Sequence, residues 1–134
     1  MTCAMSPKTI EELLAAARGR LRRVDPAAAR QAVEGGAVIV DIRAESQRAR
    51  DGVVPGAHFV NRNVLEWRAD PASDWRDPVV SDPGRQVIVM CDEGYQSSLV
   101  AATLQDLGLD ATDLEGGFQA WRRAGLPVEP DSSG

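Results

Sequence analysis

The sequence has 134 residues, with 15 basic and 20 acidic side chains, a net charge of −5 and 43% hydrophobic residues. This is the size and composition of one soluble domain, and the acidic balance argues against nucleic acid or anionic membranes as partners. Two cysteines and one histidine are too few for a disulfide framework or a zinc cluster. We therefore expect a cytoplasmic protein without metal or cofactor.

The first half of the chain alternates helical patterns with short strand patterns. Residues 6–20 carry apolar side chains three and four positions apart, which predicts an amphipathic helix with Ser6 as its cap. The elements predicted after it, in order, are an edge strand over 21–24, a helix over 27–34, a buried strand over 38–43, a helix over 44–50 and a brief strand over 58–60.

The second half continues the alternation after an irregular connection over 62–83. The elements predicted there are a buried strand over 87–90, a helix over 97–107, a short strand over 112–114 and a final helix that carries Phe118 and Trp121. Strands that alternate with helices predict an α/β domain, whose parallel sheet is covered by helices on both faces.

Cys91 occupies a special place in this pattern. It follows the apolar run Val87-Ile88-Val89-Met90 and precedes the helix that begins near Ser97. Ligands of open α/β sheets bind beyond the carboxyl ends of the strands, and a helix N-terminus favours an anion such as a thiolate. We therefore interpret Cys91 as a nucleophile; the alternative is a small buried hydrophobic residue at a strand end.

Four pieces of sequence, in this order, resemble the rhodanese-like (sulfurtransferase) domain family. They are Val40-Asp41-Ile42-Arg43, Gly52-Val53-Val54-Pro55-Gly56-Ala57, the loop that starts at Cys91, and Glu115-Gly116-Gly117-Phe118 with Trp121 and Gly125-Leu126-Pro127. The resemblance spans residues 24–127, so residues 1–23 become an N-terminal helix with its lead-in and residues 128–134 a polar tail.

The resemblance implies a five-stranded, mostly parallel sheet and a sulfurtransferase that carries a persulfide on Cys91. The sulfur would come from a small donor or a protein persulfide and pass to a thiol, cyanide or a protein acceptor. By position, the substrate-binding residues would be Asp92, Glu93, Gly94, Tyr95, Gln96 and Ser97. Asp41 and Arg43 would support the active edge of the sheet.

The cysteine loop departs from the family pattern, which often has an arginine where this chain has Gln96. The loop also contains Asp92 and Glu93, so we expect thiosulfate, a dianion, to be a poor donor. The missing arginine favours a second hypothesis, in which the protein is a non-catalytic protein-binding or regulatory module. Phosphatase or arsenate-reductase chemistry is a weaker third, because it needs an arginine to hold the oxyanion and none lies between Cys91 and Leu107.

The positions of four other side chains suggest roles for them. His58 is more often structural or exposed than a base for the cysteine, and Trp67 and Trp121 are predicted to pack in the core or as a lid. Gln96 is either a solvent-facing residue at a helix start or an amide donor to substrate.

Overall fold

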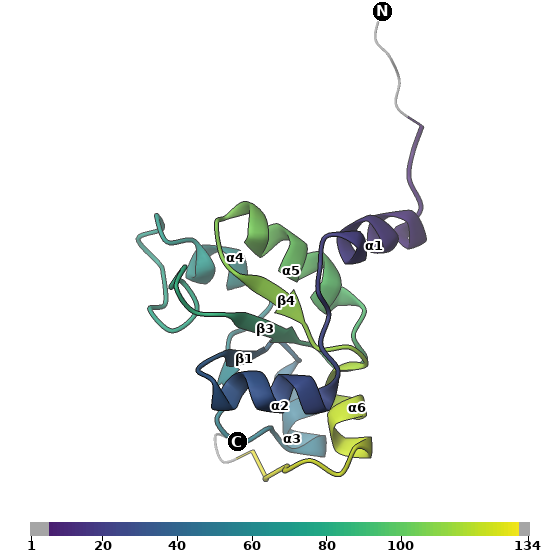
Figure 1. The fold of residues 1–134 in the computed structure, drawn as a ribbon, viewed down its shortest axis with the longest axis vertical. Coiled ribbons are helices and arrows are strands. Elements are labelled where there is room, and N and C mark those ends of the chain that lie inside the picture. Colours follow the sequence, from purple (N-terminus) through teal and green to yellow (C-terminus); the bar gives the residue numbers. More distant parts are fainter. Residues whose placement is uncertain (1–5, 132–134) are drawn as a thin grey trace, which may run out of the picture.

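Four short parallel strands form the centre of the molecule (Figure 1). The structure is a computed structural model that describes residues 6–131, so the ends of the predicted lead-in and tail lie outside the described residues. The sheet has the order β2-β1-β3-β4, with β1 (Val38–Asp41), β2 (His58–Phe59), β3 (Val87–Met90) and β4 (Ala111–Asp113). Asp41 is in register with Met90, so β1 and β3 end at the same edge of the sheet.

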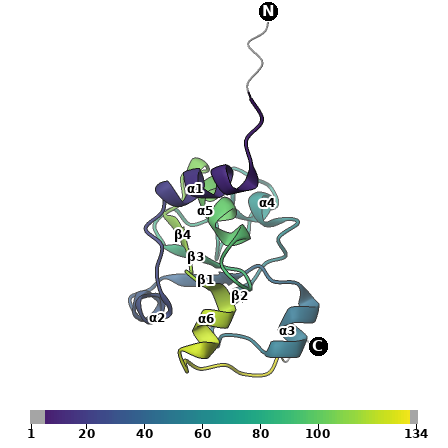
Figure 2. The same ribbon diagram turned by 90° about the vertical axis from the view of Figure 1, so that its right-hand side faces the viewer.

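Helices cover both faces of this sheet, as the alternating pattern predicts (Figure 2). Within residues 6–131, no helix has the length and apolar character needed to cross a bilayer. The helices are α1 (Ile10–Gly19), α2 (Pro26–Glu34), α3 (Glu45–Asp51), α4 (Leu65–Ala69), α5 (Gln96–Asp106) and α6 (Gly117–Arg123).

The core consists of two apolar layers, because successive strand residues point to opposite faces of the sheet. Val87 and Val89 pack with residues of α4 and α5, whereas Ile88 and Met90 pack with residues of α2 and α6. Burial on both faces explains why β3 is a continuous apolar run without polar alternation. Trp121 of α6 belongs to the second layer and is buried, as predicted.

Three sequence predictions about the fold are wrong in detail. The sheet has four strands, not five, because residues 21–24 contribute only an isolated bridge, between Val24 and Leu114 directly after β4. The first helix starts at Ile10 with Thr9 as its cap, because Thr9 and Glu12 form a reciprocal capping box that Ser6 does not offer. Trp67 is 60% exposed instead of packed, because it lies on the outer side of α4, a helix that the sequence did not reveal.

The histidine on β2 is paired with the long connection that follows α4. Nε2 of His58 lies 2.6 Å from Oδ2 of Asp77. Burial acts to raise the pKa of Asp77, but the hydrogen bonds from His58 and from the Val79 amide outweigh it, so the pKa is lowered overall. His58 therefore has a structural partner, and the Asp77 carboxylate stabilises the folded state while it is ionised.

This pair predicts a pH-dependent stability. Because the pKa of Asp77 is lower in the folded than in the unfolded chain, its contribution is complete above the unfolded value of about 3.9 and is lost as the pH falls through the folded value. We expect wild type to be more stable than Asp77→Asn at pH 6, with the gap narrowing as the pH falls below the unfolded value. Urea unfolding at a series of pH values measures this gap; a gap that stays constant with pH would contradict it.

Candidate active site

Cys91 follows the last residue of β3 and begins the turn that leads into α5. Its side chain is nearly buried, with 2% of the residue exposed, and it lines a pocket of about 290 Å³ together with Asp92, Glu93, Tyr95 and Gln96. The Gly94 N–H donates to Sγ at 3.1 Å. Among residues 6–131 this is the one amide that hydrogen-bonds to the sulfur.

The first residues of α6 hydrogen-bond to the main chain of the cysteine loop. The N–H groups of Phe118 and Gln119 donate to the carbonyl oxygens of Cys91 and Asp92, at 2.9 and 3.0 Å. Gly117 has φ +62°, and a Cβ there would lie 2.6 Å from both of these carbonyl oxygens. The Gly116-Gly117 pair is therefore needed for the close approach of α6 to the cysteine loop.

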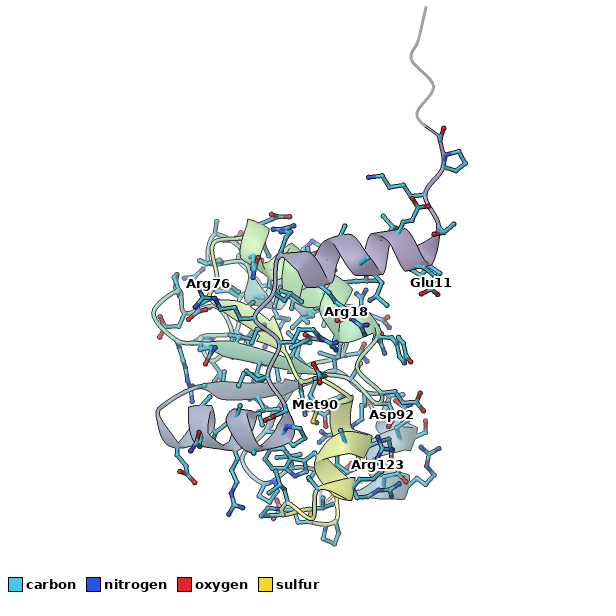
Figure 3. The ribbon with its side chains drawn as sticks, turned by 45° about the vertical axis from the view of Figure 1, so that its right-hand side comes forward. Glu11, Arg18, Arg76, Met90, Asp92 and Arg123 are labelled. Atoms are coloured by element: carbon cyan, nitrogen blue, oxygen red, sulfur yellow. The ribbon has the colours of Figure 1, made fainter. Side chains whose placement is uncertain are left out.

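Two arginines that precede the α/β core hold the loop from its other side. Arg18 of α1 and Arg23 both donate from Nη2 to the carbonyl oxygen of Gly94, at 2.8 and 2.9 Å. In Figure 3, Arg18 reaches from α1 towards the body of the domain. Sequence reasoning missed both residues, because they lie 76 and 71 positions from Gly94 and belong to no motif.

A buried carboxylate links these arginines to α5. Asp113, at the end of β4, accepts hydrogen bonds from the hydroxyls of Ser97 and Ser98 at 2.7 and 2.8 Å, and from Nε of Arg23 at 2.9 Å. Its side chain is fully buried, whereas that of Arg23 is 14% exposed. A buried charge needs such partners, so Asp113 ties the first turn of α5 to the residues before α2.

The acidic residue next to the cysteine is held by α6. The side-chain amide of Gln119 donates to Asp92 at 2.9 Å and to Asp51 at 3.1 Å (Asp92 and its place beside α6 are seen in Figure 3). A hydrogen bond from Arg50 is the largest influence on Asp51 and helps to lower its pKa to about 2. Asp51 therefore stays ionised at neutral pH and fixes the amide that contacts Asp92.

Asp41 and Arg43 meet at the end of β1 and are fully buried there. Arg43 donates from Nη2 to Asp41 at 2.8 Å and to the Gly52 carbonyl at 2.9 Å, and Arg48 also donates to Asp41, at 2.7 Å. The Arg43 guanidinium lies 3.8 Å from the centroid of the Phe118 ring. Because the Phe118 amide donates to Cys91, this stack connects β1 to the cysteine loop.

The structure brings most of the proposed site residues together, with different orientations. Gln96 is the first residue of α5 and is exposed, and Tyr95 is exposed with its ring 5.5 Å from the Arg18 guanidinium. Ser97 is buried and its hydroxyl faces Asp113. His58, on the outer strand β2, is paired with Asp77.

Together, the parallel sheet and the loop cysteine at its carboxyl edge define an α/β protein with a candidate nucleophile. The family model of the rhodanese-like domain matches residues 25–124. The chain therefore belongs to the rhodanese-like domain family, and α1 lies before the matched segment.

A named relative supports this assignment, and two solved structures share the fold. A thiosulfate sulfurtransferase GlpE of Pseudomonas paraeruginosa is 34% identical over 102 residues, which cover 75% of this chain and 84% of the relative. A protein of unknown function from Rhodopseudomonas palustris, described as a possible tyrosine phosphatase, superposes with a TM-score of 0.84 at 33% identity, covering 96% of this chain and 100% of that one. A thiosulfate sulfurtransferase of Pseudomonas aeruginosa superposes with a TM-score of 0.68 at 26% identity, covering 85% and 20% of the two chains.

The contact between α6 and the loop predicts the effect of a methyl group at Gly117. Gly117→Ala adds a clash with two carbonyl oxygens to the backbone strain of about 1–3 kcal/mol that a positive φ imposes. The matched control is Gly125→Ala, which has φ +76° but no atom within 4 Å of the added Cβ. We expect Gly117→Ala to lose more stability in urea unfolding and to change the alkylation rate of Cys91. Equal losses and equal alkylation rates would contradict the contact.

The buried pair of Arg23 and Asp113 predicts a larger loss than an exposed pair. Arg23→Gln leaves a buried carboxylate without a counter-charge, so we expect a loss of about 3 kcal/mol, of which Asp113→Asn in the same chain restores part. In the control Arg20→Gln, an exposed pair with Asp106 is lost, at a cost below about 1 kcal/mol. Thermal and urea unfolding measure both; similar losses for the two substitutions would be the contrary result.

Proposed function

We propose that this protein is a sulfurtransferase that carries a sulfane sulfur as a persulfide on Cys91. The observation that supports this most is the place of the thiol, at the turn between β3 and α5 with the Gly94 amide donating to Sγ. The Cys91 thiolate attacks the sulfane sulfur of the donor, the donor's sulfur bond breaks, and its leaving group takes the electron pair. A second nucleophile then removes the outer sulfur and returns Cys91 as a thiolate.

The donor is proposed to be a persulfide or another donor of low charge. Asp92 and Glu93 line the cysteine pocket, and the exposed amide of Gln96 stands where the family often has an arginine. A dianion such as thiosulfate meets two carboxylates there without a fixed positive charge in the loop itself. Some relatives are named thiosulfate sulfurtransferase, but that name describes those proteins and does not identify the donor of this chain. The acceptor is a thiol, cyanide or a protein, and the cytoplasm, where thiols stay reduced, is the proposed location.

Two other functions are less well supported. The absence of a loop arginine also suits a non-catalytic module that binds another protein, but such a module has no need of a thiol with an amide donor and an adjoining pocket. The name of the Rhodopseudomonas palustris relative suggests phosphatase chemistry for that protein. Here the residues between Cys91 and α5 offer no guanidinium to hold a phosphate bidentately.

Intact-mass measurement tests the proposal directly. Incubation with a small organic persulfide is expected to add the mass of one sulfur atom to wild type and nothing to Cys91→Ser, and a thiol or cyanide then removes the added sulfur. The sulfur should be gained far more slowly from thiosulfate. A protein that gains no sulfur from any donor, or gains it equally without Cys91, would show that the proposed function is wrong.

A further inference from the structure

A second hollow lies next to the cysteine pocket and has no role in the persulfide step. Its volume is about 450 Å³, and Gln96 lines both spaces. The other side chains that matter here follow β1 and β2: Arg43, Asn61, Arg62 and Asn63. In the sheet order β2-β1-β3-β4, β2 lies on one side of β1 and the later strands β3 and β4 lie on the other side. The order of the parallel strands therefore reverses between β1 and β3, and small ligands of open α/β sheets bind at the carboxyl ends of the strands at such a point.

Arg62 is a cation of this hollow whose hydrogen-bonding capacity is only partly used. Its Nε is buried and has no hydrogen-bond partner in the described part of the chain, although a buried unpaired donor is costly. Its Nη1 lies 3.5 Å from Glu66, a long contact between half-exposed side chains that contributes little. Arg43 also has an unpaired Nη1, but its guanidinium is fully buried against Asp41 and Phe118 and is already neutralised.

The groups around Arg62 are suited to a planar anion. The guanidinium offers parallel N–H donors of the kind that bind a carboxylate bidentately. Oδ1 of Asn61 accepts from the Asn63 amide at 2.8 Å, which leaves its NH₂ group available as a further donor. Glu45 also lines the hollow but is exposed, so it weakens the attraction for an anion without cancelling it.

We propose that this hollow binds the carboxylate of a small thiol that accepts the sulfur from Cys91, an inference that rests on the proposed function. Arg62 and Cys91 line different pockets, so the ligand must carry its charge and its reacting sulfur on separate groups. A carboxylate-bearing thiol does so, whereas the charge and the transferable sulfur of thiosulfate belong to one compact ion. Arg62 is thus a specificity residue for the acceptor.

The transfer step is a simple exchange between sulfur atoms. The acceptor thiol loses its proton to solvent, and the resulting thiolate attacks the outer sulfur of the Cys91 persulfide. The bond between the two sulfurs breaks, Cys91 leaves with the electron pair as a thiolate, and the acceptor becomes the persulfide. The carboxylate held by Arg62 takes no part in the bonds exchanged and only places the thiol.

A binding experiment tests the hollow independently of sulfur transfer. The protein is the Cys91→Ser variant, and the probe is 3-(methylthio)propionate, which has the carboxylate but no reactive thiol. We expect a saturable shift of the Arg62 Nε–H signal in ¹⁵N-correlated NMR spectra. The shift should be absent with the corresponding amide, which carries no charge. No saturable shift with the carboxylate would overturn the inference, whatever the sulfur-transfer assays show.

A transfer experiment then measures specificity with matched thiols. The persulfide of the wild-type protein is mixed with 3-mercaptopropionate or with 3-mercaptopropionamide, and the ratio of the two rates is compared between variants so that intrinsic thiol reactivity cancels. We expect Arg62→Gln to lower the ratio about tenfold, as the loss of a charged hydrogen bond implies, and Arg62→Lys to lower it less. Arg85→Gln, which removes a charge at the opposite edge of the sheet beside Gly36, should leave the ratio unchanged. An unchanged ratio in Arg62→Gln would overturn the inference while leaving the persulfide on Cys91 intact.

Discussion

The candidate site depends on a short loop whose main chain is clamped from two sides. On one side, the first amides of α6 donate to the carbonyl oxygens of Cys91 and Asp92. On the other, Arg18 and Arg23 hold the carbonyl of Gly94. A planar trans peptide has its C=O and N–H on opposite sides. The hydrogen bonds from the arginines to the Gly94 carbonyl therefore also fix the direction of the Tyr95 N–H. The loop conformation is therefore set before any substrate arrives, which is the preorganisation that the proposed sulfur chemistry at Cys91 requires.

The guanidinium groups of Arg18 and Arg23 also change the electrostatic environment of the site. Judged from the loop alone, Asp92 and Glu93 surround the thiol with negative charge and Gln96 offers none to balance it. In the folded protein, positive charge arrives from outside the loop, and the Asp92 carboxylate is engaged by Gln119. A persulfide anion on Cys91 is therefore less disfavoured than the loop sequence implies. Because Arg18 belongs to α1, this helix helps to support the site although it lies outside the matched family segment.

The sequence predicted those features that are encoded by neighbouring residues. The run from Val87 to Met90 has the bounds of β3 because both of its faces are buried, and Cys91 lies at the predicted end of that strand. The clamp by Arg18 could not be predicted, because a contact across 76 residues leaves no local pattern. The fifth strand was expected from family resemblance, yet Val24 forms only one bridge. The hollow beside Arg62 was hidden in a stretch without regular structure, and only the sheet order brings it next to Gln96.

We propose that one thiol, held by a fixed loop, carries the transferable sulfur. A crystal structure of the protein after treatment with a persulfide donor tests it most directly. We expect one additional sulfur atom bonded to Sγ of Cys91, with Gly94 still bound to both arginines and the path of the loop unchanged. An unmodified Cys91 in protein that has taken up sulfur elsewhere, or a loop that must be rebuilt to admit the sulfur, would contradict it.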